Sequence, residues 1–128
     1  MSVESVVFVA LCASGAASSV ANADSPTTYR VYPVVAPQTT SFPLIVYDMI
    51  AQERAKSLGG GVSDLARTLV QVDCYAHDFA TALAMADAVT AALDGNFATF
   101  KGIHQNRQNI FDADQRLYRV SQDFAVWA

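Results

Sequence analysis

The sequence predicts an α+β fold, in which an antiparallel β-sheet carries an N-terminal helix and a longer central helix packed on one face. Apolar residues recur at helical spacing in two segments and alternate with polar residues at strand spacing in others. The order helix, strands, helix, strands is typical of antiparallel sheets with helices on one face. The chain of 128 residues suits a single domain, residues 1–128. We expect residues 1–14 to form the N-terminal helix, 15–28 a connector, and 29–128 the sheet and central helix.

The N-terminal segment has the apolar pattern of one helical face. The residues at this spacing are Val3, Val6, Val7, Ala10 and Leu11. The apolar run of residues 6–13, followed by Ala21-Asn22-Ala23, also suits an export signal with its cleavage site. A signal begins with positive charge, whereas the first five residues carry only the negative Glu4. We therefore favour a retained helix over a cleaved signal.

Three strands are predicted before the central helix. Residues 29–35 are aromatic and β-branched, and Pro33 indicates a sheet edge or a bulge. Residues 44–50 are apolar on both faces, and residues 68–75 alternate as in a half-buried antiparallel strand. Between these two strands, residues 52–64 are polar and include three consecutive glycines. This composition predicts a long flexible loop, of the kind that often carries function.

A long helix is predicted between Asp78, which can cap its start, and Gly95, which stops it. Its apolar stripe consists of Phe79, Leu83, Ala86, Val89 and Leu93. The outward positions are mostly Ala and Thr, so this small face could pack against a neighbouring surface. Residues 97–111 are a weaker strand candidate, and residues 117–127 alternate clearly enough to predict the last strand.

Charge and cysteine content limit the possible functions. Eight basic residues against twelve acidic ones give a net charge of −4, which is the wrong sign for a domain that grips nucleic acid. Two cysteines are too few for a disulfide scaffold and fit a reducing compartment better. The N-terminal apolar run is also shorter than the about 20 residues that a membrane span needs.

Motifs for chemistry are largely missing. Cys74 and His77 have half of a zinc-site spacing, but the other Cys and His are isolated, so Cys74 is expected inside the sheet. Lys56-Ser57 precedes the glycines, the reverse of a phosphate-binding loop. Asp112 and Asp114 flank a predicted turn, where they are expected to bond the backbone. The residues predict a non-enzymatic domain without metal or cofactor.

Three stretches of the sequence, in this order along the chain, resemble those of a known family. They are residues 30–33 (RVYP) with 36–38 (APQ) and 43–47 (PLIVY), residues 70–76 (VQVDCYA) leading through the Ala-rich helix to 93–95 (LDG), and residues 118–127 (YRVSQDFAVW). Together they resemble the tail-completion, or tail-terminator, proteins of long-tailed phages. The resemblance covers nearly the whole chain. Similar proteins occur in phage-derived particles such as gene transfer agents.

The resemblance implies a structural virion protein of the tail, assembled in the host cytoplasm. Such a protein forms a homohexameric ring on the tail tube, ends tube growth and presents a surface to the head connector or neck protein. Its partners are then its own copies, the tube protein and the connector. DNA passes through the lumen without specific binding, and the chain's mild negative charge would keep the wall from trapping it. The family has no catalytic motif, so no catalytic residue is implied.

The candidate assembly residues flank the glycine-rich segment. Arg54, Lys56, Asp64 and Arg67 carry both signs of charge, and we expect them to contact neighbouring rings. A plain solvated loop is the alternative, because surface ion pairs are often weak. Two alternatives to the terminator function stay open: a neck or head-completion protein of the same particle, and an exported periplasmic binding or adhesion domain.

Overall fold

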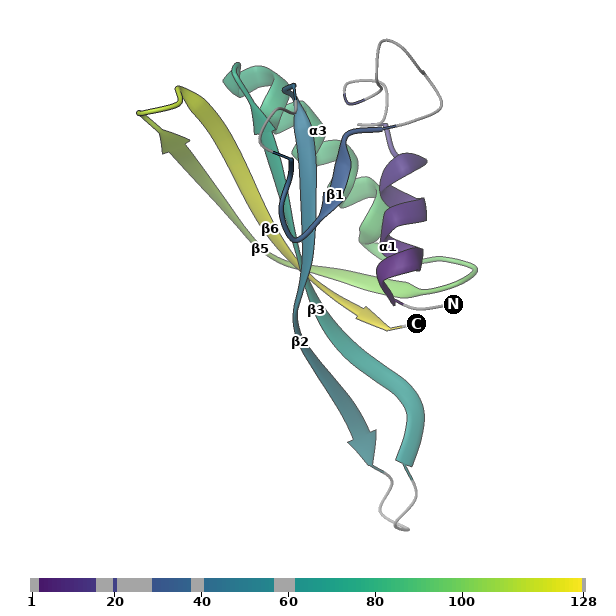
Figure 1. Cartoon of the computed structure of the whole chain (residues 1–128). Helices are drawn as coiled ribbons and strands as arrows, with labels where there is room; N and C mark the ends of the chain where they lie inside the picture. The colour runs from purple at the N-terminus through teal and green to yellow at the C-terminus, as the bar shows by residue number, and fades with distance from the viewer. Residues whose placement is uncertain (1–2, 16–19, 21–28, 38–40, 57–61, 128) are drawn as a thin grey trace.

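The computed structural model describes residues 3–15, 20, 29–37, 41–56 and 62–127, and for residues 53–56 and 62–66 it describes the backbone alone. The elements are helix α1 (Val3–Cys12), strands β1 (Val31–Pro33), β2 (Leu44–Lys56) and β3 (Val62–Ala76), helix α3 (Phe79–Leu93), and strands β4 (Gly95–Asn96), β5 (Lys101–Asp112) and β6 (Leu117–Trp127). The strands form a six-stranded sheet in the order β1-β2-β3-β6-β5-β4 (Figure 1). The predicted α+β class is confirmed.

The sheet is mixed, whereas the sequence analysis expected it to be antiparallel throughout. Every neighbouring pair is antiparallel except β1 and β2, which run parallel with Val31 opposite Ile45. Val34 has a positive φ of 65°, and its N–H donates to the carbonyl of Tyr47, so the chain turns sharply out of β1. The following segment returns to the start of β1, because the N–H of Ile45 donates to the carbonyl of Arg30. Pro33 lies on the edge strand, as predicted.

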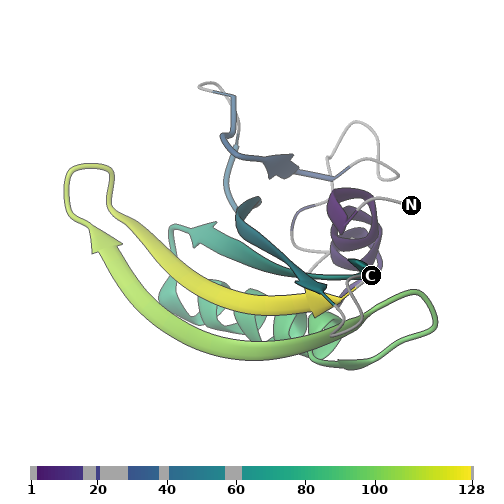
Figure 2. The ribbon, with the colours of Figure 1, turned by 90° about the horizontal axis from the view of Figure 1, so that it is seen from below.

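Helices α1 and α3 pack on the same face of the sheet and form the core with it (Figure 2). The core includes Val7 and Leu11 of α1 together with buried residues of α3 and of strands β2, β3 and β6. Figure 2 shows β5 and β6 bowed along the length of α3. Burying an aliphatic or aromatic side chain of this size contributes about 1.5–3 kcal/mol. The N-terminal helix is thus part of the core, and neither described helix is long and apolar enough to cross a membrane.

Helix α3 has the predicted bounds and the predicted cap, because the carboxylate of Asp78 accepts a hydrogen bond from the N–H of Thr81 at 3.2 Å. The predicted apolar stripe was partly wrong. The buried residues are Ala82, Met85, Ala86, Val89 and Leu93. Phe79 is exposed and Leu83 only half-buried. The first turn of α3 lies beside the end of the sheet, where Phe79 contacts the ring of Tyr118.

The predicted loop over residues 52–64 is wrong at both ends. β2 continues to Lys56 and β3 begins at Val62, with Arg54 paired to Ala66 and Lys56 to Val62. Because β6 ends at Trp127, opposite Arg67, the two strands continue beyond it as a two-stranded arm (Figure 1). In the described part of the arm, no third strand pairs with β2 or β3. Packing between the strands and the core therefore does not require the residues there to alternate between apolar and polar, which is the pattern by which a strand is predicted. The three glycines lie outside the described residues.

Candidate functional site

The four candidate assembly residues all belong to the arm and its base. Arg54 and Lys56 lie in β2, and Asp64 and Arg67 lie in β3. Arg67 is half-buried and pairs with Glu53 across the hairpin and with Trp127 on the other side. The side chains of Arg54, Lys56 and Asp64 lie outside the described part of the chain. The topology thus brings the four residues onto one projecting element, in strands where the sequence analysis expected a loop.

The face of the sheet opposite the helices contains a hollow of about 520 Å³. Residues 34–37 form one apolar wall, and Asp73, Tyr75 and Arg119 lie on the sheet side. Arg119 Nη2 lies 3.0 Å from Asp73 Oδ2, and the Asp73 side chain is only 10% exposed. The guanidinium also lies over the ring of Tyr75, 5.8 Å from its centroid. Strand alternation places these residues on one face of β3 and β6 but does not indicate that Asp73 and Arg119 pair.

Removing the partner of Asp73 should destabilise the fold. Arg119→Ala leaves a nearly buried carboxylate without its cation. We expect the free energy of unfolding to fall by about 2 kcal/mol. This is less than the full cost of breaking a buried pair, because Arg119 is partly exposed. Urea unfolding measures this loss. The double variant Asp73→Asn/Arg119→Ala should lose less than the two single losses combined. An unchanged midpoint for Arg119→Ala would show that the pair contributes nothing.

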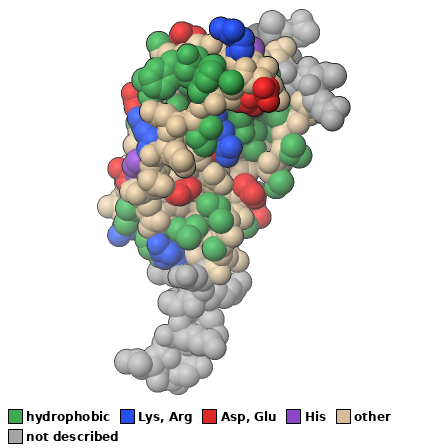
Figure 3. All heavy atoms as spheres, turned by 90° about the vertical axis from the view of Figure 1, so that its left-hand side faces the viewer, with side chains coloured by type: hydrophobic (Ala, Val, Ile, Leu, Met, Phe, Trp, Pro, Cys, Tyr) green, Lys and Arg blue, Asp and Glu red, His purple; other side chains and the backbone are tan. Residues whose placement is uncertain are grey.

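One end of the molecule carries a hydrophobic patch beside the turn between β5 and β6. Figure 3 faces this end and shows hydrophobic side chains gathered in its upper part, with acidic and basic side chains around them. Phe79 and Phe111 are both exposed there, and their rings contact Tyr118. The carboxylate of Asp112 accepts hydrogen bonds from the N–H groups of Asp114 and Gln115, as predicted for a turn.

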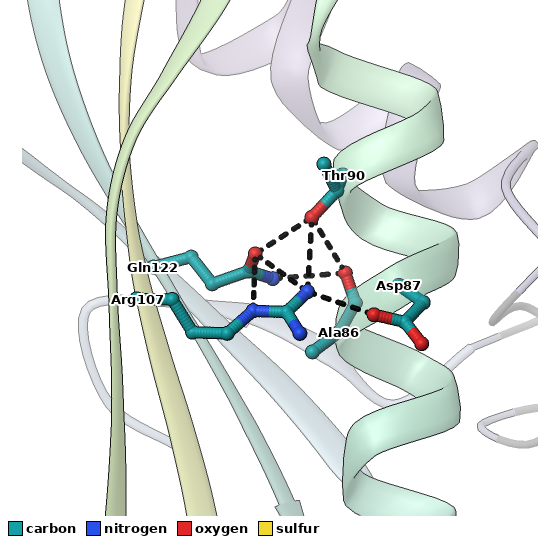
Figure 4. A network of polar contacts seen from close by, with 5 residues as sticks. All are labelled: Ala86, Asp87, Thr90, Arg107 and Gln122. Carbon is teal, nitrogen blue, oxygen red and sulfur yellow. Dashed lines mark hydrogen bonds and ion pairs between the residues drawn. The ribbon is translucent and has the colours of Figure 1, made fainter.

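A polar network on the face of the sheet that carries the helices fixes α3 to β5 and β6 (Figure 4). The Gln122 side chain is fully buried, and its Nε2 donates to the carbonyl of Ala86 at 2.9 Å. Its Oε1 lies 2.7 Å from Thr90 Oγ1 and 3.3 Å from Arg107 Nε. Arg107 Nη2 also lies 2.9 Å from Asp87 Oδ1. The network holds the helix in one position along the strands, so the surfaces built on both elements stay in register.

The sequence analysis missed this network, although one signal was present. Gln122 stands between Val120 and Phe124 in the apolar row of β6, where a polar residue must find partners once it is buried. Those partners come from α3 and β5 and are distant in the chain. The period of β6 therefore shows that Gln122 is a polar residue at a buried position, but it does not identify the residues that bond it.

The described residues offer little for catalysis or metal binding. Cys74 is fully buried in the core, whereas His77 is exposed and its ring contacts that of Phe42. No group of three His, Cys, Asp or Glu side chains suited to a metal ion occurs in the part of the chain that the structure describes. Burial raises the pKa of Cys74 to about 12 and also raises the pKa of Cys12.

Thiol labelling should distinguish the two cysteines. Because the thiolate is the reactive form, we expect Cys74 to resist alkylation in the folded protein at about pH 8, while the half-buried Cys12 reacts slowly. Pulse labelling followed by peptide mass spectrometry measures both rates. Cys74 should react as fast as a free thiol only after unfolding in urea. Equal labelling of both residues in the native protein would contradict the burial of Cys74.

The same buried groups make the fold sensitive to base. Burial raises the pKa of Cys74, Tyr47 and Tyr75, so the unfolded chain releases these protons at a lower pH than the folded chain. Stability is therefore fully present below about pH 9 and should fall as the pH rises toward 12. Urea midpoints measured across this range test the prediction. Cys74→Ala should show a shallower decline than the parent protein, and equal slopes would exclude a contribution from this thiol.

The comparisons with known proteins agree with the fold described above. A family described as tail completion protein gp17 matches residues 5–128 of this chain. The chain belongs to this family. The resemblance predicted from the sequence is confirmed, and the protein is a structural component of the virion tail of a phage or phage-like particle. No curated protein sequence matches the chain significantly.

Solved structures show the same fold. One of them, described as "Virion of native gene transfer agent (GTA) particle", matches with a TM-score of 0.64 at 20% sequence identity. The match covers 98% of this chain and 92% of that one. The fold of this chain therefore recurs in a virion chain with which it shares few individual side chains. The assembly contacts of this chain must accordingly be argued from its own residues.

Proposed function

We propose that this chain caps the tail tube as a homohexameric ring, ends tube polymerisation and joins the tail to the head connector. DNA passes through the lumen of the ring. The family match over residues 5–128 carries the proposal, since completing a tail requires a protein that stops the tube at its end. The net charge of −4 supports a lumen that does not retain DNA, because phosphate binding depends on Lys and Arg.

The position of the protein in the particle tests this proposal. A C-terminal tag labelled with gold should appear at the end of the tail tube next to the head, and quantitative mass spectrometry should find six copies per particle. Label along the whole tube or at the distal tip would contradict a terminator. Label on the head side of a separate connector would indicate the alternative, a neck or head-completion protein.

Within this function, the two-stranded arm is the element proposed to contact the neighbouring ring. It projects beyond the rest of the sheet (Figure 1), and Arg54, Lys56, Asp64 and Arg67 give it both signs of charge. Complementary charges of this kind fix orientation and register between partners more than they add affinity. A projecting arm also reaches a partner without disturbing the core on which the ring depends.

Charge reversal tests the role of the arm. Arg54→Glu/Lys56→Glu should reduce the number of joined particles at least about tenfold, because two contacts become repulsive. Gln108→Glu/Asn109→Glu is the control, since it adds acidic residues at exposed positions of β5 and should leave joining unchanged. Normal numbers of joined particles for the arm variant would remove these residues from the proposed contact.

A further inference from the structure

We propose that neighbouring copies in the ring contact each other through two different surfaces. An aromatic tip on one copy sits in an apolar groove on the next. The aromatic tip consists of Phe79, Phe111 and Tyr118. The groove lies between α1 and the connection from α3 to β5. This inference rests on the proposed ring and names the surfaces that close it.

The aromatic tip is exposed in the single chain. Phe111 is 51% exposed and Phe79 is 39% exposed, and their ring centroids lie 4.8 and 5.3 Å from that of Tyr118. Three adjacent aromatic rings form a contiguous patch rather than scattered apolar residues. Such patches typically serve as the anchors that carry most of the binding energy of an interface.

The groove has the size and lining to receive an aromatic side chain. Its volume is about 310 Å³, and its walls are Val6, Val9, Ala10, Ala13, Ala92, Phe97, Thr99 and Phe100. Val9 is 56% exposed, and the ring of Phe97 stacks on that of Phe100 at 4.6 Å, which makes one wall a flat aromatic surface. The alanines on α1 leave room between the helix and this surface.

Helix α1 itself indicates that a partner covers the groove. Phe8 and Val9 are exposed on its outer side, while its opposite side is buried in the core. A helix that is apolar nearly all round is normally buried on all sides. Among the described residues, Phe8 and Val9 stay exposed on the outer side of α1, which leaves that side for another molecule.

The arrangement of the two surfaces identifies a second copy as that molecule. The turn between β5 and β6 lies at one end of the molecule, and α1 with the connection from α3 to β5 lies at the other end, in both Figure 1 and Figure 2. The tip therefore cannot reach the groove of its own chain. A contact between two different surfaces of identical chains repeats from copy to copy and closes into a ring when the rotation between copies divides a full turn, whereas a contact between two tips would stop at a dimer.

The charges beside the two surfaces are complementary. Asp112 and Asp114 are exposed next to Phe111, and Lys101 is exposed directly after Phe100 of the groove. Arg116 is exposed in the same turn as the two aspartates, and Glu4 is exposed on α1. Docking the tip in the groove brings the two aspartates toward Lys101, whereas a tip-to-tip contact would bring together four aspartates and two arginines, so charge favours the groove.

Site-directed crosslinking in assembled particles tests the interface. Ala113→Cys places a thiol on the tip, and Thr99→Cys places one at the groove, in a Cys12→Ser background. Treated with a short bis-maleimide, particles with both substitutions should yield a ladder of crosslinked multimers that ends at the closed ring. Each single variant should stay monomeric. Ala113→Cys combined with Ser41→Cys, an exposed site that does not line the groove, is the control and should give no ladder.

The outcomes separate the interface from the function. Particles that contain the double variant at the tail end but yield only monomers would overturn the interface and leave the ring cap intact. Dimers from Ala113→Cys alone would show that tips meet tips and would also overturn it. Absence of the parent protein from the tail end would defeat the proposed function itself. As a second test, Phe111→Asp should unfold in urea like the parent protein and yet reduce joined particles at least about tenfold.

Discussion

Replacing Gly102 by alanine is expected to lower the free energy of unfolding by about 3 kcal/mol, the upper part of the usual range for overpacking. The carbonyl oxygen of Leu93 occupies the position that a Cβ atom at residue 102 would take. This oxygen belongs to the backbone at the end of α3, so no side-chain rotation can remove the overlap. Either α3 or β5 must move. Two buried core residues lie beside the contact: Leu93, which ends α3, and Phe100, which directly precedes β5.

Urea unfolding of the purified protein measures this loss, with Gly15→Ala as the matched control. A Cβ atom at Gly15 would lie 3.4 Å from Cβ of Ala88, which is an ordinary van der Waals contact. The control should therefore change stability by less than about 1 kcal/mol. If Gly102→Ala were as stable as the control, the close approach of Leu93 to β5 would be refuted.

Gln122→Ala is expected to cost about 3 kcal/mol, through a lost hydrogen-bond network and a cavity in the core. The substitution leaves the carbonyl of Ala86 and the guanidinium of Arg107 without a central partner. It also loosens the attachment of α3 to β6, because Thr90 loses its contact with the same amide. The effect exceeds that of a surface polar residue because the Gln122 side chain is fully buried.

A double-mutant cycle with Arg107→Ala should show coupling of about 1 kcal/mol or more between the two residues. Gln108→Ala, at an exposed position of β5, is the control and should change stability by less than about 0.5 kcal/mol. Additive losses for Arg107 and Gln122 would mean that the two side chains act independently. That result would contradict the claim that the network fixes the position of α3 along the strands.

Burial explains which parts of the fold could be predicted from the sequence. Helix α3 and strands β3 and β6 pack one side against the core, so their apolar residues repeat at the period of the element. Val72 and Cys74, at alternate positions of the strand predicted over residues 68–75, are both fully buried. The parallel pairing of β1 with β2 has no comparable signature, because it depends on a backbone turn at Val34 rather than on periodicity.

The arm shows why the candidate site was harder to predict than the fold. Arg54 and Lys56 were expected in a loop because polar residues and glycines follow one another without a period. In the structure their backbone is strand, held by pairing with Ala66 and Val62 rather than by packing on a core. A surface that fits a partner need not repeat with the period that packing on the chain's own core imposes.

Deleting the gene for this chain in cells that produce the particle, followed by negative-stain electron microscopy, tests the central claim most directly. The proposed terminator function predicts filled heads beside unattached tails, with tubes of abnormal length, and restoration of joined particles when the gene is supplied in trans. Intact particles with tails of normal length would contradict the claim, because tube growth and head joining would then proceed without this protein.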